Sequence, residues 1–213
     1  ETEPGDSAQR YLATGLGMGI VRRLERLGGL AIRSGSGAEW PASLGDERSG
    51  LDTLGAALIL RVTLARVGDS LDVRAALADS ASRRVRDALA QRFAITELAE
   101  IESEVAAAVA GRVHRVSTPF DPRPARHVVE PESYRLTILG FHQLLVMRDT
   151  RGALASFVRA TELDPLNVRA WAGVSSVWAS RSAGDQVPLD EGYQRSSSAA
   201  ERALAIDSTD GTA

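Results

Sequence analysis

Residues 58–79 read LILRVTLARVGDSLDVRAALAD, in which every second side chain is apolar on both sides of the pair Gly68-Asp69. Such alternation is typical of a β-strand with one buried face, and a glycine-containing pair between two alternating runs is typical of a hairpin turn. The stretch therefore predicts an antiparallel hairpin. A further alternating run at residues 85–93 predicts one more strand.

Amphipathic helices are expected on both sides of these strands. Apolar residues recur every three or four positions in residues 8–27, before a glycine pair, and again in residues 95–113. Residues 30–32 are expected to form a short strand and residues 50–54 a short helix. Four acidic residues of the second helix are expected on its solvated side: Glu97, Glu100, Glu102 and Glu104.

Four prolines between residues 111 and 133 exclude a continuous helix there, because proline lacks the N–H that a helix interior requires. This stretch predicts a Pro/Arg-rich linker at residues 114–132. The linker would separate an α/β domain at residues 1–113 from a helical region at residues 133–213.

The helical region contains an internal repeat. Residues 159–165, RATELDP, return 43 residues later as residues 202–208, RALAIDS. The first unit resembles a tetratricopeptide repeat in Leu139-Gly140 of its first helix and in four later positions. In the second unit Trp171 stands where the motif has its first-helix Trp. The second unit is about nine residues longer than the usual ~34, which predicts an insertion at residues 180–189. The four later positions of the first unit are Ala153, Phe157, Ala160 and Pro165.

The first half also resembles a known family. Gly5-Asp6-Ser7 precedes a helix, and residues 54–60 (LGAALIL), 66–79 and 101–106 (IESEVA) follow in order. Over residues 5–113 these segments are similar to the TolB amino-terminal-like domain. The family's first strand would precede Gly5, so the chain is expected to be a fragment or to receive that strand from a partner. Its aromatic segment after the hairpin is replaced here by residues 85–90.

The two resemblances together imply a fold of class α+β/α. A small mixed α/β domain with an antiparallel hairpin would be followed by two helix pairs similar to tetratricopeptide repeats. In bacteria this order occurs in the carboxy-terminal sensor or interaction regions of some serine/threonine protein kinases and adenylate cyclases. The resemblance implies a periplasmic or other extracytoplasmic location next to a membrane, with the cytoplasm as the alternative.

Composition excludes several classes of function. The 213 residues carry a formal net charge of -3, which gives no general attraction to nucleic acid, and no cysteine is present to form a disulfide or a zinc–thiolate site. No run of 18 apolar residues occurs, so attachment to a membrane is expected only through segments or partners outside this chain.

Catalytic motifs are not expected either. Gly15, Gly17 and Gly19 lack the spacing and the preceding strand of a dinucleotide-binding loop, and they instead predict a helix packed closely against a neighbour. Residues 34–37 (SGSG) do not match a nucleophile elbow. The three histidines are not spaced as metal ligands. We therefore expect no enzyme activity, cofactor or metal.

Function is thus expected from surfaces. The sequence predicts a non-catalytic module that senses or binds protein partners, with two alternatives: a structural or adaptor subunit of a membrane-associated assembly, and a small-molecule-sensing domain. Trp171 and Trp178, two helical turns apart, are interpreted as core residues, with an aromatic ligand shelf as the alternative. Six residues are the candidates for partner binding: Arg123, Arg126, Arg135, Gln143, Arg169 and Ser176.

Overall fold

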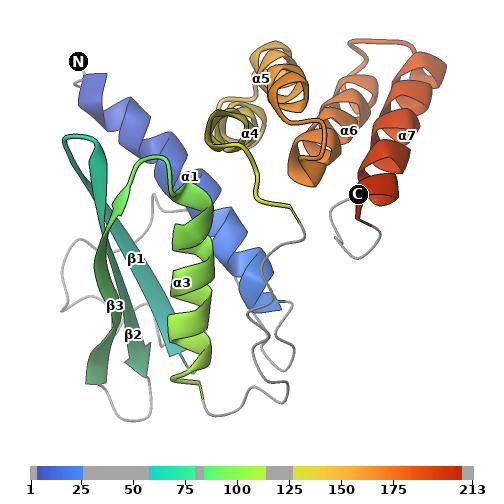
Figure 1. Cartoon of the computed structure of the whole chain (residues 1–213). Helices are drawn as coiled ribbons and strands as arrows, with labels where there is room; N and C mark the ends of the chain where they lie inside the picture. The colour runs from blue at the N-terminus through green and yellow to red at the C-terminus, as the bar shows by residue number, and fades with distance from the viewer. Residues whose placement is uncertain (1–3, 26–57, 80–83, 114–126, 208–213) are drawn as a thin grey trace. The chain divides into compact units, whose positions relative to one another are not determined.

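The computed structural model describes residues 4–25, 58–79, 84–113 and 127–207. The chain forms two compact units that meet in sequence between residues 123 and 124, inside the segment expected to be a linker. The first unit contains α1 (Pro4–Glu25), β1 (Leu58–Val67), β2 (Ser70–Asp79), β3 (Arg84–Ala94) and α3 (Leu98–Ala110). The second contains α4 (Pro131–Leu145), α5 (Thr150–Leu163), α6 (Val168–Ala183) and α7 (Leu189–Ile206) (Figure 1).

The described fold is mixed, with a three-stranded antiparallel sheet in the order β1-β2-β3 and six helices. The predicted hairpin is confirmed: Val67 pairs with Ser70, so Gly68 and Asp69 form the turn. Gly68 has a φ of 62°, which glycine adopts at little cost and which a two-residue hairpin turn requires. The additional strand is also confirmed as β3, and a bulge interrupts its pairing with β2 between Ala75 and Ala76. The strand expected at residues 30–32 and the helix expected at residues 50–54 lie outside the described residues.

Helices α1 and α3 lie side by side on one face of the sheet (Figure 1). The period-2 pattern explains this arrangement, because alternate residues of β2 point to the helices and are buried. Each large aliphatic side chain in this core contributes about 1.5–3 kcal/mol to stability. The core includes Leu12, Leu16 and Ile20 of α1, Leu71 and Val73 of β2, Phe93 of β3, and Ile101 and Val105 of α3.

One sequence prediction for α3 is wrong. Glu102 was expected in solvent with the other three glutamates, but only 3% of it is exposed. It faces α1, where its carboxylate lies against Gly19 and 3.5 Å from Nε of Arg23. The reason is that α3 is covered both by the sheet and by α1, so its buried surface is wider than that of a helix with a single packing neighbour.

The glycines of α1 differ in their surroundings. Gly15 and Gly19 are buried, and a Cβ atom added at Gly19 would meet the carboxylate of Glu102 on α3. Gly17 is half-buried, and a Cβ atom added there would meet nothing within 4 Å. The close packing expected of the three glycines is therefore seen at Gly19 and not at Gly17.

In the second unit, consecutive helices form two antiparallel pairs, α4 with α5 and α6 with α7, and α6 also packs on both helices of the first pair. Phe157 of α5 is fully buried at their junction. Its ring fills the space beside Gly140 of α4 and Gly173 of α6, where a Cβ atom would clash with it. It also meets the ring of Phe141 edge-on, with 4.9 Å between centroids.

A buried polar network joins the same three helices. The side chain of Asn167 caps α6 by accepting a hydrogen bond from the N–H of Ala170, at 3.1 Å. Its amide nitrogen donates to Ser133 Oγ at 2.8 Å and to Thr137 Oγ1 at 3.0 Å on α4. Ser133 in turn donates to the carbonyl of Ala160 on α5, at 2.8 Å. Every member thus has a partner, as burial of polar groups requires.

Candidate functional site

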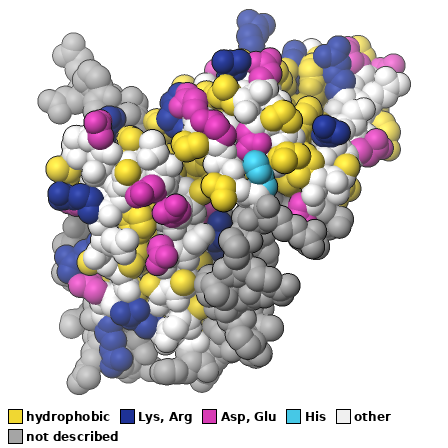
Figure 2. Space-filling view, viewed as in Figure 1, with side chains coloured by type: hydrophobic (Ala, Val, Ile, Leu, Met, Phe, Trp, Pro, Cys, Tyr) yellow, Lys and Arg dark blue, Asp and Glu magenta, His cyan; other side chains and the backbone are white. Residues whose placement is uncertain are grey.

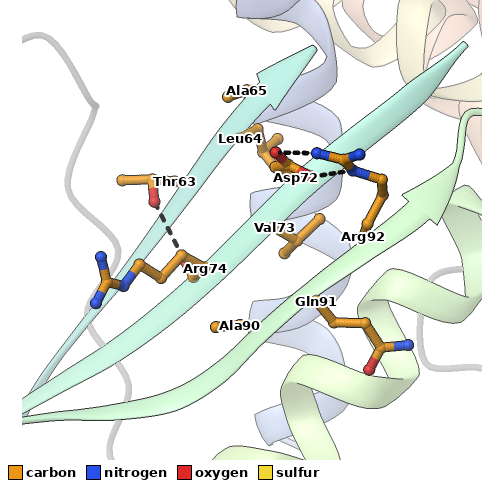
Figure 3. A pocket seen from close by; sticks show the side chains of 9 residues that line it. All are labelled: Thr63, Leu64, Ala65, Asp72, Val73, Arg74, Ala90, Gln91 and Arg92. Atoms are coloured by element: carbon orange, nitrogen blue, oxygen red, sulfur yellow. Dashed lines mark hydrogen bonds and ion pairs between the residues drawn. The ribbon is translucent and has the colours of Figure 1, made fainter. Parts of the chain in front are cut away.

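Two grooves on the described surface, one in each unit, are of a size that could hold a ligand. The first, of about 500 Å³, lies on the sheet (Figure 3). The small side chains of Ala65 and Ala90 form the floor of this groove, and charged side chains of β2 and β3 lie beside them. The residues around this sheet groove are Thr63, Leu64, Ala65, Asp72, Val73, Arg74, Ala90, Gln91 and Arg92.

Two bidentate ion pairs cross the same face of the sheet. Arg92 donates to both carboxylate oxygens of Asp72, at 2.6 and 2.9 Å, and Arg74 donates to both oxygens of Asp87, at 3.2 and 2.7 Å. These hydrogen bonds lower the pKa of Asp72 and of Asp87, and they raise the pKa of each arginine. The charges of the groove are therefore paired with each other, which leaves little unbalanced charge to attract an ionic ligand.

The second groove, of about 420 Å³, lies between α6 and α7. Trp178 forms one wall and is only 9% exposed. The guanidinium carbons of Arg195 and Arg181 lie 4.4 and 4.9 Å from the centroid of its ring, within the range of a cation–π contact. The residues lining this α6–α7 groove are Trp171, Val174, Trp178, Gln194, Arg195, Ser198 and Ala199.

Trp171 has a fixed orientation in this groove. Its indole N–H donates to the carbonyl of Pro165 at 3.0 Å, and the ring is half-buried. Across the helix pair, the hydroxyls of Ser175 and Ser196 lie 3.0 Å apart, so the two helices approach closely beside the groove. Both tryptophans thus belong to the packed surface of α6 and also line a groove, so neither of the two interpretations made from sequence is complete.

The four described candidates for partner binding lie apart from both grooves. Arg135 donates to Glu132 on its own helix, and this contact lowers the pKa of Glu132. Gln143 accepts a hydrogen bond from Ser156 at 2.7 Å.

The other two belong to α6. The guanidinium of Arg169 lies over the rings of Tyr134 and Phe141, at 5.6 and 5.9 Å. Ser176 is exposed and donates to the carbonyl of Ala172. Arg123 and Arg126 lie outside the described residues.

Sequence reasoning missed the residues that α7 and β3 bring to the grooves. Arg195 lies four residues after Glu191 and forms an ion pair with it, at 3.0 Å. From the sequence alone, this spacing indicates only an ordinary solvated ion pair on one helix. The sequence does not show that α7 places Arg195 over the ring of Trp178, which lies seventeen residues earlier. Long-range pairing likewise brings Arg92 to Asp72.

The described residues contain no group of three histidine, aspartate or glutamate side chains placed to hold a metal ion. None of the described helices combines the length and the apolar character needed to cross a membrane.

Comparison with protein-family models, curated proteins and solved structures finds no match to this chain.

Proposed function

We propose that this chain is a non-catalytic interaction module whose helical unit binds a partner protein through one face of α7. The two helix pairs are interpreted as tetratricopeptide-like units and the first unit as a TolB-like domain of a larger bacterial signalling protein. Support for the binding face comes from a difference between the two copies of the internal repeat.

In the first copy, the face of α5 that points away from α4 is covered by α6. Phe157 fills the space beside Gly173, and Thr161 is only 7% exposed. The corresponding positions on α7, 43 residues later, are Ala200 and Leu204, and Leu204 is 43% exposed. The face that accepts the next helix in the first copy is thus open in the second.

Two larger side chains extend this open face. Leu189 and Tyr193 are 77% and 71% exposed, and they lie one helical turn apart. Together with Ala200 and Leu204 they form an apolar face along α7, because spacings of four and seven residues return to one side of a helix. Single exposed apolar residues need no explanation, but an aligned series on one helix is typical of an interaction surface. In Figure 2, hydrophobic side chains lie among acidic and basic ones on the visible face of the helical unit.

The chemistry of the α7 apolar face indicates the kind of partner. Asp190 and Glu201 are exposed and lie on the same flank of it, so a second copy packed antiparallel would bring like charges together. An amphipathic helix with basic residues beside its apolar stripe fits better, since it would bury the leucines and pair with the acids. Both repeat geometry and charge thus favour a helical partner.

The proposal can be tested by site-specific photo-crosslinking in the native cell. A benzophenone amino acid at position 193 is expected to capture one partner in fixed stoichiometry, whereas the same group at the exposed position 159 of α5 is not. The double variant Tyr193→Glu/Leu204→Glu should abolish the complex, and Arg159→Glu should preserve it. Recovery of the same partner from the double variant would refute binding through this face.

The sheet groove supports the small-molecule alternative by its size, because ligand sites are commonly about 300–1,000 Å³. Calorimetric titration of the full chain with polar metabolites would test it. Saturable heat that disappears in Arg92→Gln would favour a sensor over an interaction module.

A further inference from the structure

We infer that the α6–α7 groove is a second binding site, which takes an extended peptide carrying a carboxylate next to an apolar side chain. It lies on a different flank of α7 from the apolar face, because Arg195 follows Tyr193 by two residues and hence by about 200° around the helix. The two sites can therefore be altered separately.

The groove is specific to the second helix pair. By the 43-residue repeat, Arg195 and Ala199 of α7 correspond to Gly152 and Ser156 of α5. In the first pair, the side chain of Gln143 on α4 fills the space beside these two positions. It accepts the hydrogen bond from Ser156, and its amide nitrogen lies 3.0 Å from where a Cβ atom at Gly152 would be. In the second pair Ala199 has no hydroxyl group to form such a hydrogen bond, and Trp178 and Arg195 line the groove instead.

The charges around Trp178 favour a carboxylate. A guanidinium that lies over an aromatic face keeps the N–H groups in its own plane available for hydrogen bonds. Arg195 uses one nitrogen for Glu191, and Nε of Arg181 is buried without a hydrogen-bond partner among the described residues. Of the two guanidinium groups over Trp178, that of Arg195 lines the groove, and that of Arg181 lies outside the groove lining and has no ion pair with a carboxylate among the described residues. A ligand carboxylate would balance the remaining charge and accept charge-assisted hydrogen bonds.

The shape and the apolar surface of the groove favour an extended peptide. Trp171 and Trp178 are seven residues apart on α6, which corresponds to about 10 Å along the helix. Three residues of an extended chain span about the same distance. Trp171 offers a half-buried ring held by its bond to Pro165, with Val174 buried beside it, so an apolar side chain next to the carboxylate would find a preformed contact.

The test is a titration of the full chain with the capped five-residue peptide Ser-Leu-Asp-Leu-Ser. Binding would be read from the indole N–H signals in NMR spectra, assigned with Trp171→Phe and Trp178→Phe. We expect saturable shifts of both signals, and about ten-fold weaker binding of the same peptide with Asn in place of Asp. Absence of shifts up to about 10 mM peptide, or equal binding of the two peptides, would overturn the inference.

Variants locate the site. Arg195→Gln is expected to weaken binding several-fold, and Arg181→Gln to weaken it less, because only Arg195 lines the groove. Arg159→Gln, an exposed arginine of α5 paired with Glu162, is the matched control. Tyr193→Ser should leave peptide binding unchanged, so failure of the groove is distinguishable from failure of the α7 apolar face. Circular dichroism of each variant checks folding, and Arg195→Lys separates loss of charge from loss of the planar donor. Equal weakening by Arg159→Gln would contradict the assignment.

Discussion

The carboxylate of Glu102 on α3 occupies the space that a Cβ atom at position 19 of α1 would need. Glycine at this position therefore leaves room for the Glu102 side chain between the two helices. It also places Arg23, one helical turn later on α1, within 3.5 Å of the same carboxylate. A buried carboxylate needs such a partner, because an isolated buried charge is strongly unfavourable.

Replacing Gly19 by Ala should destabilise the chain by about 1–2 kcal/mol, because the buried, paired carboxylate has to move and this cost exceeds the gain from the better helix propensity of alanine. Gly17→Ala is the control on the same helix. It has free space around it, so the better helix propensity of alanine should stabilise the chain by up to about 1 kcal/mol. Urea unfolding followed by circular dichroism measures both. Equal effects at the two positions would show that α1 and α3 do not meet at Gly19.

Truncation of Phe157 to Ala should cost about 3–5 kcal/mol, because it empties the space between Gly140 and Gly173. Gly173→Ala should cost about 1–3 kcal/mol by the opposite effect, overpacking against the same ring. Gly184→Ala, at the end of α6 and with only ordinary contacts, should change stability by less than about 0.5 kcal/mol. Thermal unfolding monitored by tryptophan fluorescence in a Trp40→Phe background gives the comparison.

Asn167→Ala should destabilise the helical unit by about 2–3 kcal/mol. The change removes the cap of α6 and leaves the buried hydroxyls of Ser133 and Thr137 without their donor. Asp149→Ala removes the cap of α5 at an exposed position and should cost only about 1 kcal/mol. If chemical denaturation gave the two variants the same loss, the bridge from Asn167 to α4 would not contribute to stability.

The ion pairs on the sheet should be visible in the titration of their carboxylates. Hydrogen bonds from Arg92 hold the pKa of Asp72 below its ordinary value, and Arg74 does the same for Asp87. Because the pKa is lowered in the folded state, this stabilisation is complete above the ordinary aspartate pKa of about 3.9 and is lost as the pH falls through the lower folded-state pKa.

Carboxyl carbon NMR spectra recorded against pH would measure both values. Arg92→Gln should return the pKa of Asp72 toward the ordinary value and leave Asp87 unchanged, and Arg74→Gln should do the reverse. A rise of both pKa values in either variant would mean that the two pairs are coupled rather than independent.

Local patterns predicted much of the secondary structure. Alternation around Gly68 predicted the hairpin with its correct turn, and helical spacing predicted α1 and α3, whose ends differ from the predicted bounds by two to four residues. These features could be predicted because a strand or helix exposes one side and buries the other, so that apolar residues recur at a regular spacing in the sequence.

The candidate sites could be predicted far less. Trp171 and Trp178 were recognised as a pair, but Arg195 was not, because its contact with Trp178 depends on how α7 lies against α6. The sequence wrongly predicts Glu102 in solvent for the same kind of reason. The pattern of α3 indicates one solvated side, and α1, which covers Glu102, is distant in sequence.

The sequence by itself determined where the three strands, α1 and α3 form and where the hairpin turns, since periodicity and turn chemistry act between residues a few positions apart. Only the tertiary structure decided which acids are buried, which glycines permit close packing and which face of α7 stays open. These depend on contacts between distant segments, and packing at van der Waals distance decides them side chain by side chain.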